Sequence, residues 1–306
     1  MEVINQYLNY IKYKKNLSKN TIDSYYVDIK KYFNYLNSNG IDLKSVTEND
    51  IISYIIKLES NKISPSSISR NISSIKSFHE YLFFNHISMN NPAKTIKKPK
   101  VSKYDMNILS KEEIYLLLDF KMDDKKSIRD KAIFEILYGT GIKVSELVML
   151  DIDDINLSLD YIHCKNTKID RIIPITDVVR FYLKKYIKEA RCEIAKEYEK
   201  ALFVNSFGNR FTRQGLWKLI KKRAEYVNIK KNINPSMLRN SFAIHLLNEG
   251  ANIVVVGKIL GNSNLSSMQS YIEHIDNNIR KEIKDKHPRK TNKGGFFDES
   301  NLDDNR

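Results

Sequence analysis

The sequence contains little cysteine and no long apolar segment. Cys164 and Cys192 are the only cysteines among 306 residues, and their spacing fits neither a metal site nor a disulfide framework. No apolar run approaches the roughly 18 residues that a membrane-spanning helix needs. The first residues, "MEVINQYLNYIKYKK", carry their positive charge after the apolar part, whereas a secretory signal carries it before. We therefore expect a cytoplasmic protein with no membrane partner and no bound metal.

Acidic residues are outnumbered by basic ones. The chain has 51 Lys and Arg against 37 Asp and Glu, a formal net charge of +14. Such an excess suits a polyanionic partner, and nucleic acid is the commonest one. An AT-rich coding sequence would also enrich Ile, Asn, Lys and Tyr, so the charge alone leaves both interpretations open. The hydrophobic content of 42% and the charged content of 29% are typical of a globular chain.

Apolar periodicity predicts four helices within residues 1–92. Apolar side chains recur close to every 3.6 residues in residues 22–36 and again in residues 68–82. The sequence "TEND" at residues 47–50 is a capping box at the start of another helix. We expect these helices to form a small all-α domain.

A basic segment follows at residues 93–107. Pro92 and Pro99 interrupt helical structure there. Five lysines crowd together in it: Lys94, Lys97, Lys98, Lys100 and Lys103. The segment is either a solvated hinge between domains or a strap that lies along a phosphate backbone. We favour the DNA-binding strap, because a hinge needs no such density of charge.

A second domain is predicted over residues 108–289. The sequence "SKEE" at residues 110–113 is a capping box that opens it. The stretch "DYIHCKNTKIDRIIPI" has two short apolar arms around a Lys-rich turn, which predicts a β-hairpin, and "ALFVN" at residues 201–205 predicts a further short strand. Residues 290–306 are polar, and we expect them to be disordered. Helices are expected at residues 111–119, 127–138, 144–150, 176–190, 212–226, 235–248, 252–260 and 264–273.

Four stretches carry a resemblance to a known family. "NLSKNTIDSYYVDIKKYFNYL" and "SPSSISRNISSIKSFHEYLFFNHISMNNPAKTIKKPK" resemble the core-binding domain of Xer-type tyrosine recombinases in the phage integrase family. "LYGTGIKVSELVMLDIDDI" and "PSMLRNSFAIHLLNEGANIVVVGKILGNSNLSSMQSYIEHI" resemble the family's catalytic domain, and the likeness runs in order from residue 4 to residue 289. The resemblance implies a mostly α fold. It pairs an N-terminal four-helix core-binding domain with a C-terminal α-rich catalytic domain that holds a small antiparallel sheet.

The resemblance also implies a DNA-cutting activity that uses a tyrosine. Family members form a 3′-phosphotyrosyl link and then rejoin the strand to another one, as four protomers on two duplexes. The expected partners are therefore double-stranded DNA and recombinase protomers. Because cutting and joining conserve the bond energy, no cofactor is expected. In the family, arginines grip the scissile phosphate, and a lysine on a β-hairpin protonates the departing 5′ oxygen.

Three positions of this implied catalytic set are intact in the chain. The nucleophile falls on Tyr271, and the second arginine falls on Arg239 in "PSMLRNSF". The hairpin lysine falls on Lys165, with Lys168 as the alternative, because the turn differs in length from the family's.

Three other positions depart from the family's pattern. Lys143 stands where arginine is expected, and it keeps the positive charge but cannot form bidentate hydrogen bonds to a phosphate. Ser236 and Asn262 stand where histidine is expected, and neither side chain shuttles a proton at neutral pH. A lost transition-state donor typically costs about 10²–10³ in rate. The three departures therefore predict a slow enzyme or none.

Two histidines lie near these positions in the sequence. His245 follows Arg239 by six residues on the predicted helix, about 600° round its axis, so it points away and is expected to be structural. His274 lies one turn beyond Tyr271, where it could approach the phenol, but a solvated surface histidine is the favoured interpretation.

Two functional hypotheses follow. The first is a site-specific recombinase that still cleaves DNA, supported by the survival of Tyr271, Arg239 and the hairpin lysine. The second is a catalytically impaired DNA-binding paralogue or a partner subunit of a recombinase complex, supported by the three departures. A type IB topoisomerase would share the chemistry, but the N-terminal domain resembles that of the recombinases.

Overall fold

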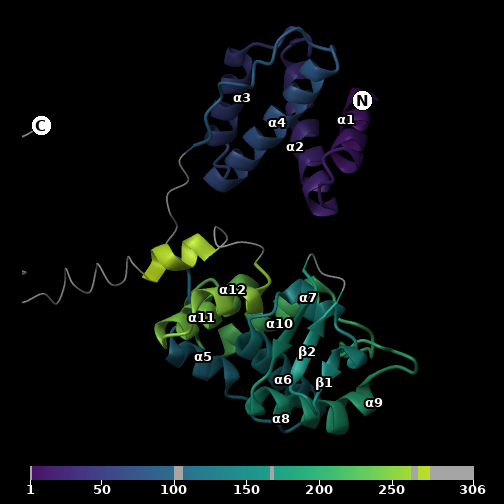
Figure 1. Cartoon of the computed structure of the whole chain (residues 1–306), viewed down its shortest axis with the longest axis vertical. Coiled ribbons are helices and arrows are strands. Elements are labelled where there is room, and N and C mark those ends of the chain that lie inside the picture. Colours follow the sequence, from purple (N-terminus) through teal and green to yellow (C-terminus); the bar gives the residue numbers. More distant parts are fainter. Residues whose placement is uncertain (1, 100–105, 166–168, 263–267, 276–306) are drawn as a thin grey trace, which may run out of the picture. The chain divides into compact units, whose positions relative to one another are not determined.

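The computed structural model describes residues 2–99, 106–165, 169–262 and 268–275. The chain forms two compact units, residues 1–104 and 105–306 (Figure 1), each with a hydrophobic core of its own. Within the described ranges, no helix combines the length and the apolar character that crossing a bilayer requires.

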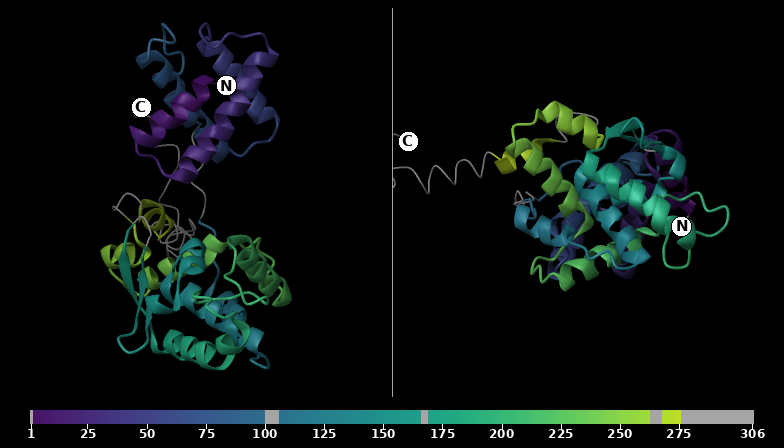
Figure 2. Two further views of the ribbon diagram at one scale, coloured as in Figure 1. Left: turned by 90° about the vertical axis from the view of Figure 1, so that its right-hand side faces the viewer. Right: turned by 90° about the horizontal axis from the view of Figure 1, so that it is seen from below.

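The N-terminal unit consists of four helices, which confirms the prediction from periodicity. They are α1 (Glu2–Tyr13), α2 (Lys19–Ser38), α3 (Glu48–Ser60) and α4 (Pro65–Phe84). α4 packs against α2 and α3, and α1 packs against α2, so the helices form one bundle (Figure 1, and the left view of Figure 2). The predicted capping box is present: the Asp50 N–H donates to Thr47 Oγ1 at 3.3 Å, and the Thr47 N–H donates to Asp50 Oδ2 at 2.8 Å.

The basic segment begins against the core of this unit. Ala93 and Ile96 are buried among its helices, whereas the side chains of Lys94, Lys97 and Lys98 are exposed. Because the two apolar residues hold the backbone in place, these lysines are presented from a fixed edge of the bundle. Lys100 and Lys103 lie outside the described residues.

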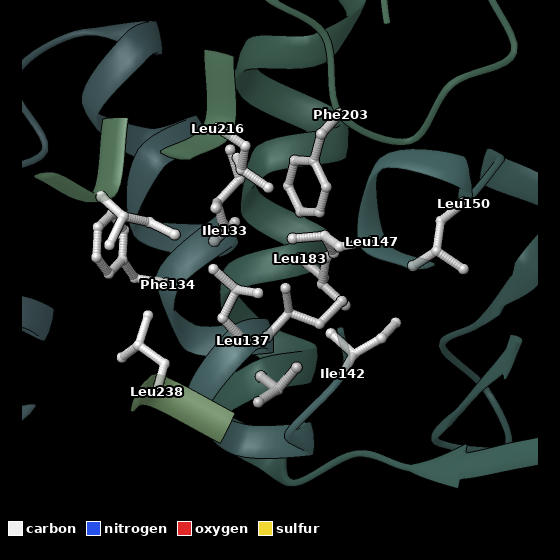
Figure 3. Packing of buried hydrophobic residues seen from close by; sticks show 14 of the residues in the cluster. Ile133, Phe134, Leu137, Ile142, Leu147, Leu150, Leu183, Phe203, Leu216 and Leu238 are labelled. Atoms are coloured by element: carbon white, nitrogen blue, oxygen red, sulfur yellow. The ribbon is translucent and has the colours of Figure 1, made fainter. Parts of the chain in front are cut away.

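The C-terminal unit is mostly helical. Its longest described helix, α6, packs against α5, α8 and α11. The side chains of Ile133, Phe134 and Leu137 on α6 are buried among residues of these neighbours (Figure 3). The helices are α5 (Lys111–Leu118), α6 (Lys125–Thr140), α7 (Val144–Met149), α8 (Asp177–Lys185), α9 (Cys192–Ile194), α10 (Arg213–Tyr226), α11 (Pro235–Asn248) and α12 (Ile253–Leu260), and residues 269–275 are also helical.

The predicted hairpin is confirmed and belongs to a small antiparallel sheet. The strands β1 (Ile155–Asn156), β2 (Tyr161–Cys164) and β3 (Arg171–Pro174) pair in the order β1-β2-β3. In the hairpin, Cys164 pairs with Arg171 and Tyr161 pairs with Pro174. This register places Arg171 at the end of the hairpin nearest its turn.

The strand predicted at residues 201–205 is wrong. Ala201 and Val204 form only isolated bridges, and no strand of the described sheet pairs with this segment. The segment is bonded by backbone and side chain together: the Leu202 N–H donates to the Leu150 carbonyl oxygen at 2.9 Å, and Arg191 donates to the carbonyl oxygens of Ala201 and Leu202, with Nε–O distances of 3.0 and 3.2 Å. A buried carbonyl that is already satisfied in this way does not require a neighbouring strand.

The helix predicted at residues 176–190 changes character part-way. α8 ends at Lys185 and continues as a π-helical turn over Tyr186–Arg191. Within that turn, Tyr186 is buried and its hydroxyl donates to the Leu202 carbonyl oxygen at 3.0 Å. A π-helical turn contains one more residue than an α-helical turn. Tyr186 and Arg191 lie in this turn, and both bond to the backbone of residues 201–204.

Candidate active site

Arg239 lies on α11 and is buried despite its charge, with 9% of its surface exposed. Its Nη1 donates to the Gly141 carbonyl oxygen at 2.7 Å, and its Nη2 donates to the Leu260 carbonyl oxygen at 2.6 Å. Gly141 ends α6 with φ +60°, and a side chain there would collide with Phe242. The guanidinium is therefore fixed between the end of α6 and the end of α12.

Tyr271 lies beside Arg239 and is also buried, with 7% exposed. It packs in an apolar cluster with Phe242 and Leu260. Its hydroxyl donates to Asn240 Oδ1 at 3.1 Å. Burial raises the pKa of the Tyr271 phenol above its ordinary value, and the neighbouring Arg239 cation acts in the opposite direction. The structure thus brings together two residues that are 32 positions apart in the sequence.

Lys143 precedes α7 and is half-exposed, with 48% of its side chain accessible. Its backbone N–H donates to Glu146 Oε2 at 3.0 Å, and its Nζ lies 3.8 Å from Glu146 Oε1. Glu146 is bound on its other side by Arg171, whose Nη1 and Nη2 donate to the carboxylate at 3.1 and 2.7 Å. Burial alone would raise the pKa of Glu146, but the hydrogen bonds from Arg171 and from the Lys143 N–H hold it below its ordinary value.

Arg171 also contacts the end of α12. Its Nε donates to the Ile259 carbonyl oxygen at 2.8 Å. Gly261 follows with φ +67°, and a Cβ there would lie 2.7 Å from Arg171 Nη1. Arg171 and Arg239 therefore hold consecutive carbonyl groups, those of Ile259 and Leu260, just before Asn262.

Arg171 is a buried residue next to the candidate site that the sequence did not reveal. It begins β3, in which Ile172 is exposed and Ile173 is buried, and two adjacent isoleucines give no alternation from which the inward side of the strand could be read. Only 7% of its side chain is exposed. The carboxylate that compensates this buried charge, Glu146, is 25 positions away, and its proximity could not be read from the sequence.

Lys165 lies at the end of β2 and forms an ion pair. Its Nζ is 2.9 Å from Asp154 Oδ1, and 43% of its side chain is exposed. The hydrogen bond from Lys165 to Asp154 raises the pKa of the lysine. Lys168, the alternative hairpin lysine, lies outside the described residues.

Ser236 and Asn262 differ in their surroundings. Ser236 is exposed in the first turn of α11, where its N–H donates to Asn234 Oδ1 at 3.0 Å. Asn262 is partly buried, and its Nδ2 donates to the sulfur of Met268 at 2.8 Å. Asn262 therefore contacts the segment that leads to Tyr271, whereas Ser236 faces solvent.

The two histidines that lie nearby in the sequence have different surroundings. His245 is buried, and its Nδ1 lies 3.0 Å from the Tyr138 hydroxyl in an edge-on ring contact. This packing supports the structural interpretation of His245. His274 is partly buried, three residues beyond Tyr271. Among the residues that the structure describes, no group of three His, Cys, Asp or Glu side chains is placed to hold a metal ion.

Models of two protein families match the chain. The "Phage integrase family" model matches residues 107–278, and the "Phage integrase, N-terminal SAM-like domain" model matches residues 4–85. Together they cover both units.

Curated relatives and solved structures agree with these matches. The chain is 38% identical over 292 residues to tyrosine recombinase XerD of Oceanobacillus iheyensis, covering 94% of this chain and 98% of the relative. It is 37% identical to tyrosine recombinase XerD of Staphylococcus epidermidis, covering 94% and 99%.

The fold is similar to that of XerH recombinase bound to a palindromic difH substrate, with a TM-score of 0.75, 20% identity and coverage of 92% of this chain and 84% of that one. A lambda integrase dimer bound to a COC′ core site gives a TM-score of 0.69 at 14% identity, covering 88% and 94%. The chain therefore belongs to the phage integrase family of tyrosine recombinases, a family of enzymes.

Proposed function

We propose that this protein is a site-specific DNA recombinase that cleaves and rejoins DNA through a phosphotyrosine on Tyr271. The observation that carries the proposal is the buried pair of Tyr271 and Arg239. Both hydrogen bonds from the Arg239 Nη atoms go to neutral carbonyl oxygens. The guanidinium therefore keeps a positive charge that a phosphate placed beside the phenol would compensate.

The chemistry assigns one task to each group. Tyr271 Oη forms a bond to the scissile phosphorus, the P–O5′ bond breaks, and the phenol proton passes to solvent. Arg239 stabilises the negative charge that builds on the phosphate oxygens. Lys165 protonates the departing 5′ oxygen after it leaves Asp154. Rejoining reverses these steps, with a 5′ hydroxyl of another strand as the attacking group.

Double-stranded DNA is the proposed partner, and the proposed assembly contains four recombinase protomers. The structures of XerH and lambda integrase, both bound to DNA, support the choice of partner. The exposed lysines Lys94, Lys97 and Lys98 would add phosphate contacts and a steep salt dependence of binding.

The altered positions make this a slow enzyme. The Lys143 ammonium group is a point charge and cannot make the bidentate hydrogen bonds that an arginine would make to a phosphate. Its Nζ also lies 3.8 Å from the Glu146 carboxylate. Ser236 and Asn262 supply hydrogen bonds but no proton transfer at neutral pH. The same three positions favour a second candidate, a DNA-binding partner subunit that does not cleave.

A covalent trapping experiment distinguishes the two candidates. The protein is incubated with a nicked duplex of its target site, from which the cleaved end diffuses away, and adducts are measured on a denaturing gel. We expect an adduct that Tyr271→Phe abolishes and that Tyr115→Phe, at an exposed tyrosine of α5, leaves unchanged. If the protein forms no adduct, even with a partner recombinase present, it acts as the non-cleaving subunit.

A second set of variants tests the altered positions. Lys143→Arg, Ser236→His and Asn262→His in one chain should raise the adduct yield, because they restore a forked cation and two groups capable of proton transfer. Lys184→Arg, at an exposed lysine of α8, is the matched control. An unchanged yield in the triple variant would contradict our explanation of the slow rate.

A further inference from the structure

Asn240 is the side chain that holds the hydroxyl of the nucleophile. Tyr271 Oη donates to Asn240 Oδ1 at 3.1 Å. Asn240 directly follows Arg239 on α11 and is partly buried. Consecutive residues of a helix point about 100° apart, so the amide and the guanidinium contact the phenol from different directions.

The two neighbours have opposite effects on the phenol proton. Burial raises the pKa of Tyr271, and the Arg239 cation, which favours the phenolate, partly offsets that rise. An amide oxygen that accepts the O–H hydrogen bond favours the neutral phenol instead. The amide can hold this proton in a hydrogen bond, but it cannot take it, because it is not a base at neutral pH.

We propose that Asn240 is a positioning residue for strand cleavage: it orients the Tyr271 hydroxyl beside Arg239 before DNA is bound. This inference rests on the proposed function. When Tyr271 Oη bonds to phosphorus, the P–O5′ bond breaks and the phenol proton passes to solvent, so the hydrogen bond to Asn240 is lost in the same step. Asn240 therefore stabilises the resting enzyme relative to the reacting one.

Among the described residues, the charges that are known to act on this pair belong to different elements. Arg239 on α11 acts directly on the phenol. Glu146 on α7 and Arg171 on β3 act on Arg239. A change at Asn240 removes no charge, so its effect on the pH dependence of cleavage reports on the hydrogen bond itself.

The first test compares the pH profiles of adduct formation for the wild type, Asn240→Ala and Asn248→Ala. Asn248 is an exposed asparagine at the end of the same helix and serves as the control. A hydrogen bond of ordinary strength corresponds to a shift of about half to one pH unit. We expect the Asn240→Ala profile to move to lower pH by this amount and the Asn248→Ala profile to stay in place. An unmoved Asn240→Ala profile would overturn the inference.

The second test does not depend on cleavage. Asn240→Ala and Tyr271→Phe are combined in a double-mutant cycle on the unfolding equilibrium. We expect the two changes to be non-additive by about fivefold in the unfolding equilibrium constant, since each alone breaks the same hydrogen bond. Additive effects would refute the contact. If the wild type forms no adduct at any pH, the proposed function fails, and this cycle still decides whether Asn240 holds the phenol.

Discussion

Replacing Arg171 by methionine should destabilise the C-terminal unit strongly. Arg171 and Glu146 have 7% and 9% of their side chains exposed and form a bidentate pair. Methionine keeps the apolar stem but removes both donors and the bond to the Ile259 carbonyl oxygen. Glu146 then stays buried without its guanidinium partner. Removing one partner of a buried ion pair costs about 3–5 kcal/mol.

The pH dependence of this loss has a defined sign. In the wild type, the pKa of Glu146 is lowered, so its contribution to stability is present at neutral pH and is lost as the pH falls through the folded pKa. In Arg171→Met, burial without the cation raises the pKa of Glu146, so the variant loses stability as the pH rises. The stability difference between the two proteins should therefore be small in acid and grow toward pH 7.

Urea unfolding followed by tryptophan fluorescence measures this difference. Trp217 is the only tryptophan in the chain and lies on α10, so its signal reports on the C-terminal unit. Glu146→Gln added to Arg171→Met should restore about 1–2 kcal/mol, because an amide replaces the buried charge. Arg180→Met is the control: 39% of the Arg180 side chain is exposed, and it should cost under about 1 kcal/mol. A loss below about 1 kcal/mol for Arg171→Met at pH 7, or one independent of pH, would refute this reasoning.

Two further predictions concern the N-terminal unit. His79 is fully buried and its pKa is lowered to about 4 by burial, so the unfolded chain binds its proton first as the pH falls from about 6.5. This should cost about 3 kcal/mol by pH 4, measured as faster hydrogen exchange in α2 and α4. His79→Gln should abolish that acid dependence, and equal acid sensitivity in this variant would contradict the assignment. Replacing Lys97 and Lys98 by alanine should weaken DNA binding and reduce the log–log salt slope by about 2. The same change at two other exposed lysines, Lys184 on α8 and Lys188 in the π-helical turn that follows it, should leave the slope as it was, and an equal slope for both double variants would make the segment a solvated hinge.

Local sequence signals were sufficient where the structure is stabilised locally. The capping boxes at Thr47 and Ser110 marked helix starts correctly, because their hydrogen bonds join residues three positions apart. The same kind of inference failed at residues 201–205, where the short apolar segment "ALFVN" suggested a strand. There Arg191, a residue outside the pattern, satisfies the backbone carbonyls. Propensity cannot anticipate that backbone pairing will stop at isolated bridges and that a distant side chain will bond the carbonyl groups.

In the candidate site too, local sequence motifs identified some residues, whereas contacts between distant residues revealed others. The family motifs located Tyr271 and Arg239, since each is recognisable from the residues on either side of it. They gave no sign of Arg171 or Asn240, whose importance comes from what they contact. Glu146 makes the burial of Arg171 possible, and the phenol of Tyr271 gives Asn240 its role.

The sequence by itself determined the helical periods, the excess of positive charge, the family and the identity of the altered residues, because each of these is a property of the chain or of short stretches of it. Only the tertiary structure decided which groups share a site. The ends of α6 and α12 meet on Arg239, and this brings Tyr271 against Asn240 on α11. Such proximity depends on how α6 packs between its neighbours, since burying its apolar side chains fixes distances between residues that are far apart in sequence.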